Sequence, residues 1–288
     1  MNTVRRCQPL LGTFVEITVT GEQDESCLSV HVSRGFERIS EIGALMSFHD
    51  AGSELSLLNR EAFHRPVSVH PWLWERLHGA TAMSRLSDGA FDITIAPRLM
   101  EWGLLPTHGA KLKPSGGWRD IHLLDGHRVS FGQNLAIDLG GMAKGFAVDH
   151  AMELLIAAGI PQITVNAGGD LRIHGDLPPL LSVRDPASPH EGVLEIPFAA
   201  QSAATSAAYF SLKRHRFRKV SHLVDPETGR AHCGKGSVTV FAENCEWADA
   251  LTKVVLFSKT PEIRERALSH YQASACVLVS GKPPIFLP

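Results

Sequence analysis

Apolar and polar residues follow two periods along the chain, and these periods predict both strands and helices. In residues 13–19, apolar side chains alternate with polar ones between two glycines, which predicts a strand with one buried face. In residues 26–46, apolar side chains recur every three or four positions, which predicts a long amphipathic helix. Pro71 suits the first turn of a second helix, and the segment 87–97 is predicted as a turn leading into a short apolar stretch.

The middle of the chain is predicted to change from loop to strand to helix. Residues 103–120 contain many Gly, Pro and Ser residues and are predicted as a loop. The segments 128–132 and 135–140 are predicted to pair as a hairpin. A helix is expected from about residue 143 to residue 158, ending at Gly159.

Short strands dominate the second half of the sequence. A helix is predicted at 246–257 and a last strand at 274–280, and the other predicted strands lie within 162–175, 180–186, 192–200, 203–212, 217–226 and 237–242. No repeat and no internal boundary is visible in this order of elements. The sequence therefore predicts an α+β fold and a single domain over residues 1–288.

Composition and charge are those of an ordinary globular protein. Of the 288 residues, 44% are hydrophobic and 20% are charged, and the formal net charge is −2. The one basic run, residues 213–219, has a single interleaved aromatic residue, Phe217. We therefore expect an exposed turn there and no nucleic-acid partner.

Cysteine usage and the terminal segment bear on the compartment. The five cysteines are odd in number and form no CxxC motif, which argues against a disulfide framework and a zinc site. The apolar stretch after Arg5 and Arg6 is too short for a signal peptide, and no run of 18 apolar residues occurs. A cytoplasmic protein without a membrane span is expected.

The segment from Asp138 to Lys144 is the first candidate for chemistry. Two glycines allow a tight turn and close approach of a ligand, and the start of the following helix suits a phosphate group. Lys144 in the first helical turn opposes the helix dipole, which makes sense if it faces an anion. A plain turn with a solvated lysine explains the same residues about equally well.

Two further segments are ambiguous when each is taken by itself. Asp249, Thr252 and Lys253 share one face of the predicted C-terminal helix, and a carboxylate with a hydroxyl suits Mg²⁺. An Asp–Lys ion pair on a solvated face is the simpler alternative. The two glycines before Asp170 indicate a hairpin.

A serine-nucleophile enzyme is not supported, because the sequence has no GxSxG motif.

Taken together and in order, eight segments carry a resemblance to a known family. They are LLGTFVEI, SFHDAGSELSLLN, DGAFDITIAP, IDLGGMAKGFAVD, VNAGGDLRIHG, ATSAAYF, SHLVDPETGR and ADALTK. From about residue 9 to residue 258 the chain resembles the ApbE family of FAD:protein FMN transferases. The resemblance implies an ApbE-like, T-fold-related architecture of mixed sheets with packed helices. It also implies Mg²⁺-dependent transfer of FMN from FAD onto a Thr or Ser of a target flavoprotein, with AMP leaving.

The resemblance also assigns roles to individual residues. His222 matches the family's candidate general base, and Lys144 would act beside it and in the FAD site. The metal would lie near the backbone carbonyl of Gly141 and near Asp249. Thr252 is a further candidate ligand because it shares a helix face with Asp249, not because of the resemblance. The other residues that would contact FAD are Leu11, Phe48, Ala90, Phe91, Asp92, Asp138 and Leu223.

Three departures from the family pattern matter for function. Leu11 stands where the family usually has Met, Ala207 where it has Gly, and Lys253 where it often has a threonine metal ligand. We expect Lys253 to take the place of part of the metal cluster, by pairing with Asp249 or with the FAD phosphate, which leaves at most one Mg²⁺. The alternative is that Lys253 points to solvent and Thr252 restores the ordinary ligand set. Lys253 thus leaves a non-catalytic FAD-binding protein open as one alternative. An FAD pyrophosphatase that releases FMN and AMP is a second alternative.

Overall fold

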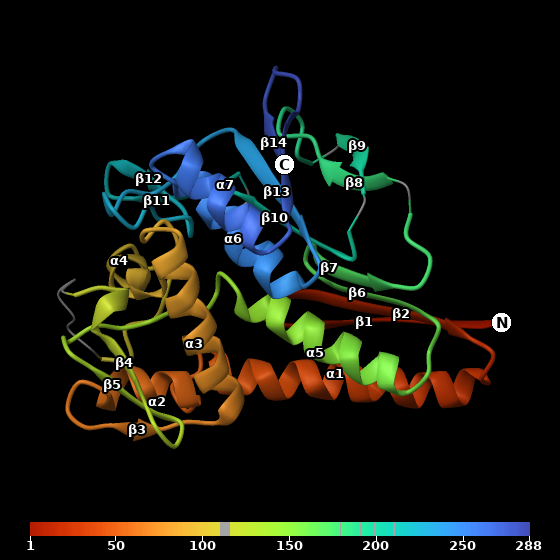
Figure 1. Cartoon of the computed structure of the whole chain (residues 1–288), viewed down its shortest axis with the longest axis horizontal. Coiled ribbons are helices and arrows are strands. Elements are labelled where there is room, and N and C mark those ends of the chain that lie inside the picture. Colours follow the sequence, from red (N-terminus) through yellow and green to blue (C-terminus); the bar gives the residue numbers. More distant parts are fainter. Residues whose placement is uncertain (110–115, 179, 191, 199, 210) are drawn as a thin grey trace.

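An antiparallel sheet of eight strands forms the framework of the chain (Figure 1). The computed structural model describes residues 1–109, 116–178, 180–190, 192–198, 200–209 and 211–288. In spatial order the strands are β1 (Asn2–Leu10), β2 (Thr13–Gly21), β6 (Gln162–Ala167), β7 (Asp170–His174), β10 (Ser202–Ala207), β13 (Gly236–Ala242), β14 (Ser274–Val279) and β15 (Ile285–Leu287). Strands from the two ends of the sequence thus share one sheet.

Three long helices pack on this sheet and bury its apolar face. They are α1 (Glu25–Met46), α5 (Ala143–Ala157) and α6 (Cys245–Phe257). α1 and α5 lie side by side along β1, β2 and β6, and α6 packs against β10 and β13 (Figure 1). Val15, Ile17 and Val19 on β2 are fully buried, as their alternation predicts.

A smaller group of elements continues the core at one end of the sheet, seen at the lower left of Figure 1. It contains a short sheet of three strands, in the spatial order β3, β5 and β4, whose bounds follow with those of the other elements. The group comprises α2 (Glu54–Glu61), β3 (Val67–Ser68), α3 (Pro71–Leu86), the 3-10 turn η1 (Ile93–Ile95), α4 (Ala96–Glu101), the 3-10 turn η2 (Trp118–Asp120), β4 (Ile121–Leu124) and β5 (Arg128–Phe131). Its buried residues join those of α1, α5 and α6 in one apolar cluster.

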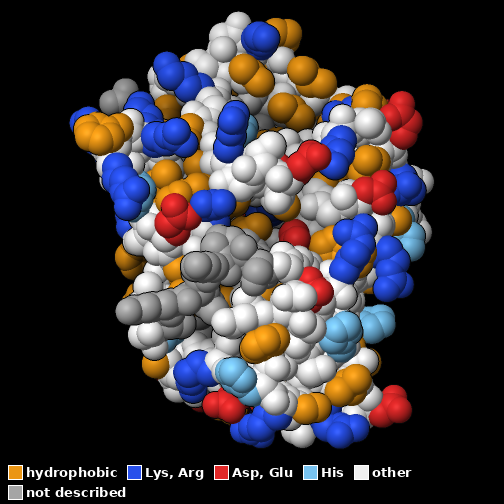
Figure 2. All heavy atoms as spheres, turned by 90° about the vertical axis from the view of Figure 1, so that its left-hand side faces the viewer, with side chains coloured by type: hydrophobic (Ala, Val, Ile, Leu, Met, Phe, Trp, Pro, Cys, Tyr) orange, Lys and Arg blue, Asp and Glu red, His pale blue; other side chains and the backbone are white. Residues whose placement is uncertain are grey.

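Three peripheral elements complete the fold. The hairpin of β8 (Leu180–Arg184) and β9 (Val193–Pro197) covers a second, small apolar cluster, and α7 (Pro261–His270) follows α6. The basic run forms a hairpin of β11 (Lys213–His215) and β12 (Arg218–Val220), with Phe217 exposed at its tip, so the expected exposed turn is confirmed. Figure 2 shows the side of the molecule on which this hairpin lies; Lys and Arg side chains are most frequent at its upper left, with others at the right and at the bottom.

The α+β class and most predicted elements are confirmed, and one pairing is wrong. β5 pairs with β3 and β4, whereas residues 135–138 form no strand, so the hairpin predicted for 128–132 and 135–140 does not exist. Residues 110–115 of the expected loop, and residues 199 and 210 of two predicted strands, lie outside the described residues. Within the described part of the chain, no helix is both long and apolar enough to cross a membrane.

Candidate functional site

A cavity of about 910 Å³ lies where α1, the turn 138–144 and α6 meet. This volume is within the usual range for a small-molecule site. Every predicted site residue except Thr252 lines the cavity, namely Leu11, Phe48, Ala90, Phe91, Asp92, Asp138, Gly141, Lys144, His222, Leu223 and Asp249. Segments far apart in the sequence therefore meet at one site.

The apolar part of the cavity wall comes from four elements or turns. Phe48 follows α1, Phe91 precedes η1, and both rings are buried in the wall. Leu223 lies beyond β12, and Leu11 occupies the turn between β1 and β2 with a positive φ of 54°. These aromatic and aliphatic side chains offer flat surfaces on which a ring system can pack.

A hydrogen-bonded clamp from α2 fixes the backbone just before Asp138. The side chain of Asn59 donates to the carbonyl of Ile137 at 2.9 Å and accepts from its N–H at 2.8 Å. The N–H of Asp138 itself donates to the carbonyl of Ile93 at 2.8 Å. These bonds replace the strand pairing that the sequence predicted for this segment, and Asn59 was not identified from the sequence.

The carboxylate of Asp138 stands at the cavity wall. It accepts a hydrogen bond from the N–H of Gly140 at 3.2 Å, which closes the turn before α5. Burial raises the pKa of Asp138, and the Gly140 bond together with nearby His49 and Lys253 opposes that rise. A carboxylate in such a place can accept hydrogen bonds from a ligand's N–H or O–H groups.

Two lysines and two aspartates form a charge cluster at the cavity floor. Lys144 forms an ion pair with Asp170 and lies 3.5 Å from Asp249, while Lys253 forms an ion pair with Asp249. The aspartate side chains are only 4% and 2% exposed, whereas those of Lys144 and Lys253 are 31% and 17% exposed. The lysines are therefore the more exposed members of this cluster, and Asp249 lines the cavity beside them.

Asp170 was missed as a site residue because the sequence showed only a hairpin there. Its position directly after two glycines, at the start of β7, brings the carboxylate to Lys144 on α5. Burial alone would raise the pKa of Asp249, but Lys144 and Lys253 outweigh burial and hold that pKa below its usual value. Both lysines therefore face an ionised carboxylate.

Close packing of α5 on α6 fixes the distance between Lys144 and Asp249. A Cβ atom at Gly145 would lie 2.5 Å from the backbone oxygen of Cys245, so only glycine fits at this crossing. The carboxylate of Asp149 accepts hydrogen bonds from the N–H groups of Cys245 at 3.0 Å and Glu246 at 2.9 Å. Asp149 thereby satisfies two N–H groups at the first turn of α6.

Two of the three groups that the sequence placed around a divalent ion, Asp249 and Thr252, already have other partners. The hydroxyl of Thr252 is fully buried, donates to the carbonyl of Asp249 at 2.6 Å, and lies 2.7 Å from the hydroxyl of Ser206. Asp249 faces a lysine on each carboxylate oxygen. As folded, Asp249 and Thr252 therefore do not provide the free oxygen ligands that a Mg²⁺ site needs.

His222 faces the cavity from the segment after β12. Partial burial lowers the pKa of His222 below its ordinary value of 6.5, with Lys213 and His49 adding to the effect and a hydrogen bond with the Leu104 backbone opposing it. The imidazole is therefore neutral at pH 7 and able to accept a proton. His49, which the sequence analysis did not single out, lines the same cavity.

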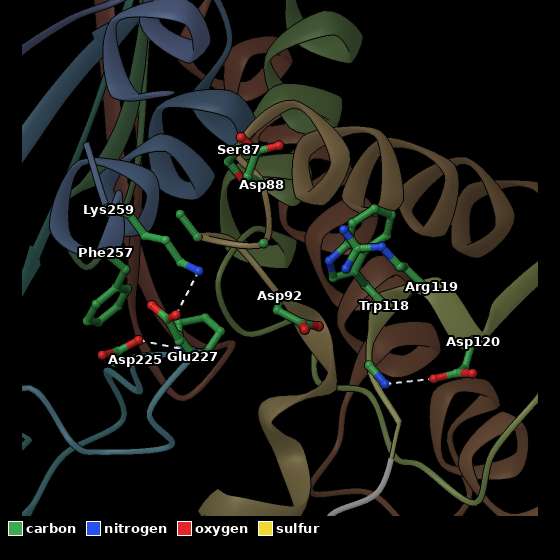
Figure 3. A pocket seen from close by; sticks show the side chains of 14 residues that line it. Ser87, Asp88, Asp92, Trp118, Arg119, Asp120, Asp225, Glu227, Phe257 and Lys259 are labelled. Atoms are coloured by element: carbon green, nitrogen blue, oxygen red, sulfur yellow. Dashed lines mark hydrogen bonds and ion pairs between the residues drawn. The ribbon is translucent and has the colours of Figure 1, made fainter. Parts of the chain in front are cut away.

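A smaller hollow of about 360 Å³ adjoins the cavity and is shown in Figure 3. Lys259 points toward Glu227 and pairs with it at 2.7 Å, while Asp120 accepts from the N–H of Gly117 at 2.9 Å. The guanidinium of Arg119 lies over the Trp118 ring at 4.2 Å. Of the predicted site residues, only Ala90 and Asp92 line this hollow, so the larger cavity is the better candidate site.

Comparison with known proteins identifies relatives over nearly the whole chain. Residues 11–278 match the ApbE family. The chain is 29% identical over 262 residues to the FAD:protein FMN transferase of Vibrio cholerae, with 84% of this chain and 78% of that protein covered. It is 26% identical over 275 residues to the protein of the same name from Treponema pallidum, with 85% and 76% covered.

Solved structures show the same fold. The crystal structure of the ApbE protein from Thermotoga maritima superposes with a TM-score of 0.83 at 26% identity, covering 99% of this chain and 96% of that one. The flavin transferase ApbE from Vibrio cholerae superposes with a TM-score of 0.79 at 24% identity, covering 99% and 96%. The predicted ApbE-like architecture is thereby confirmed.

Proposed function

The chain belongs to the ApbE family, and from this premise we propose that it transfers FMN from FAD to a Thr or Ser hydroxyl of a target flavoprotein. Relatives covering most of the chain are named FAD:protein FMN transferases. The observation that carries the proposal is the cavity, which combines aromatic walls with two lysines at its floor. FAD is a pyrophosphate between two aromatic ring systems, so its chemistry matches both parts.

In this proposal the cavity orients FAD through its two kinds of surface. Phe48, Phe91 and Leu223 pack on the rings, while Asp138 accepts hydrogen bonds from N–H or O–H groups of FAD. The ammonium groups of Lys144 and Lys253 face the pyrophosphate. Positioning and charge neutralisation supply most of the catalysis in phosphoryl transfer.

The proposed reaction is a single displacement at the phosphorus next to riboflavin. The acceptor hydroxyl oxygen forms a bond to this phosphorus, and the bond from phosphorus to the bridging oxygen breaks. AMP leaves with that oxygen. Neutral His222 takes the hydroxyl proton, as its lowered pKa allows. Lys144 and Lys253 offset the negative charge that develops on the phosphate oxygens.

Mg²⁺, which the sequence predicts, would supply further positive charge at the pyrophosphate when bound. As folded, Asp249 and Thr252 already have other partners. The role of a divalent ion stays a prediction.

Intact-protein mass spectrometry tests the proposal. A flavoprotein acceptor is incubated with the enzyme and FAD, with and without Mg²⁺, beside an acceptor in which the modified Thr is replaced by Ala. We expect the first acceptor to gain the mass of one FMN and the second to gain nothing. Release of free FMN and AMP without a mass gain would identify a pyrophosphatase. Unchanged FAD would identify a non-catalytic binder.

A further inference from the structure

We infer that the ammonium group of Lys253 occupies the position that the family resemblance gives to a divalent ion. The pyrophosphate of FAD is then held by two lysines and not by a metal ion on Asp249. This inference rests on the proposed function, because it concerns the same site and the same substrate.

The path of the Lys253 side chain carries the inference. Lys253 lies one helical turn after Asp249 on α6, and its ammonium group pairs with the Asp249 carboxylate and donates to the Asp249 carbonyl at 3.0 Å. Its Cε lies 3.4 Å from where a Cβ at Gly141 would stand. The side chain therefore lies between Gly141 and Asp249, two of the three groups expected to bind the metal.

The carboxylate of Asp249 has no oxygen free of a lysine. One oxygen pairs with Lys253, and the other lies 3.5 Å from the ammonium group of Lys144. A charged ammonium has three donors and no lone pair, so it cannot join a metal's ligand set. A divalent cation bound to Asp249 would also stand close to two positive charges in a largely buried place.

Charge balance in the cluster supports the same conclusion. The two negative charges of Asp170 and Asp249 are matched by the two positive charges of Lys144 and Lys253. The part of the chain that the structure describes contains no group of three or more His, Cys, Asp or Glu side chains arranged to hold a metal. The two partly exposed ammonium groups can instead donate to phosphate oxygens, because lysine binds phosphate as a compact point charge.

Two measurements that need no catalysis test the inference. Binding of FAD is followed by flavin fluorescence in EDTA and in excess Mg²⁺. Binding of Mn²⁺ to the protein alone is followed by the loss of its free-ion EPR signal. Four variants are compared with the wild type: Lys253→Met, Lys253→Arg, Lys253→Thr and Lys259→Thr. Circular dichroism melting shows that each variant is folded.

Each variant separates one property of the side chain. The wild type is expected to bind FAD in EDTA and to bind no stoichiometric Mn²⁺. Lys253→Met should weaken FAD binding in EDTA by about 10- to 100-fold, because one hydrogen bond to a charged group is lost. Mg²⁺ should not restore the FAD affinity of this variant. Lys253→Arg keeps the charge and should bind in EDTA. Lys253→Thr should bind one Mn²⁺ and regain FAD affinity in Mg²⁺.

Lys259→Thr is the matched control, since it removes a lysine two residues beyond α6 whose partner is the exposed Glu227. It should behave as the wild type. The inference is overturned if wild-type FAD binding requires Mg²⁺, if the wild type binds Mn²⁺ stoichiometrically, or if Lys253→Met binds FAD as the wild type does. In those cases FAD still binds and the proposed function stands. A wild type that binds no FAD under either condition contradicts the proposed function itself.

Discussion

Replacing Asn59 by Ala tests whether a residue outside the cavity sets the position of Asp138. Asn59 does not line the cavity, yet its side chain makes two hydrogen bonds, of 2.9 Å and 2.8 Å, to the backbone of Ile137. Each such bond contributes about 0.5–1.5 kcal/mol. The variant should therefore lose roughly 1–3 kcal/mol of the free energy that holds this segment in its position. If that cost falls on the binding-competent arrangement, FAD affinity drops by about 5- to 150-fold.

The assay is an FAD titration by fluorescence, together with a urea unfolding curve for each variant. Asn59→Asp retains an acceptor for the Ile137 N–H but loses the donor to the Ile137 carbonyl, so it separates the two bonds. Glu61→Ala is the control on the same helix, because it removes only a surface ion pair with Arg65. Wild-type FAD affinity in a folded Asn59→Ala protein would refute the positioning role, whatever the change in unfolding free energy.

Three further residues give separate predictions. His222→Ala should slow FMN transfer by about 10²–10⁴-fold with little change in FAD affinity, and a wild-type rate would rule out a general base. The pKa of His222 is lowered below its ordinary value of 6.5, so the wild-type rate should fall on the acid side only at pH values below 6.5. A pH–rate profile measures this. Gly145→Ala forces a Cβ against the Cys245 backbone and should destabilise the fold by about 1–3 kcal/mol in urea unfolding, with an unchanged midpoint as the contrary result. Burial raises the pKa of Asp149 from 3.8 to about 7, so the stability it provides is present below 3.8 and is lost as pH rises through about 7. Asp149→Asn should therefore flatten the dependence of unfolding free energy on pH over this range, and an unchanged slope would contradict the assignment.

Local patterns predicted the elements whose side chains divide cleanly between core and solvent. β2 and α1 were found because each has a regular apolar pattern: every second residue in β2, and every third or fourth residue in α1. β1 was missed because its more buried face is only half-buried and carries Asn2, Arg6 and Gln8, so no apolar alternation marks it. The segment 135–138 looked like a strand, but its backbone groups bond to Asn59 and Ile93, which local sequence does not show.

The same limit applies to the site. Lys144, Asp138 and Asp249 were selected from short motifs and the family resemblance, and the structure brings them to one cavity. The pairing of Lys144 with Asp170 joins residues 26 positions apart on different elements, which no local spacing predicts. Buried pairs of this kind depend on how α5 crosses the sheet.

The strand order also constrains how the chain can fold during synthesis. β2 pairs with β6, and residues 11 and 253, which share the cavity wall, are 242 positions apart. At a typical rate of synthesis, roughly 12–48 s pass between the emergence of these two residues. The β1–β2 hairpin must wait with an unpaired edge, and α1, which follows at once and packs on both strands, is placed to shield its apolar face. We therefore expect flavin binding to appear only in the completed chain.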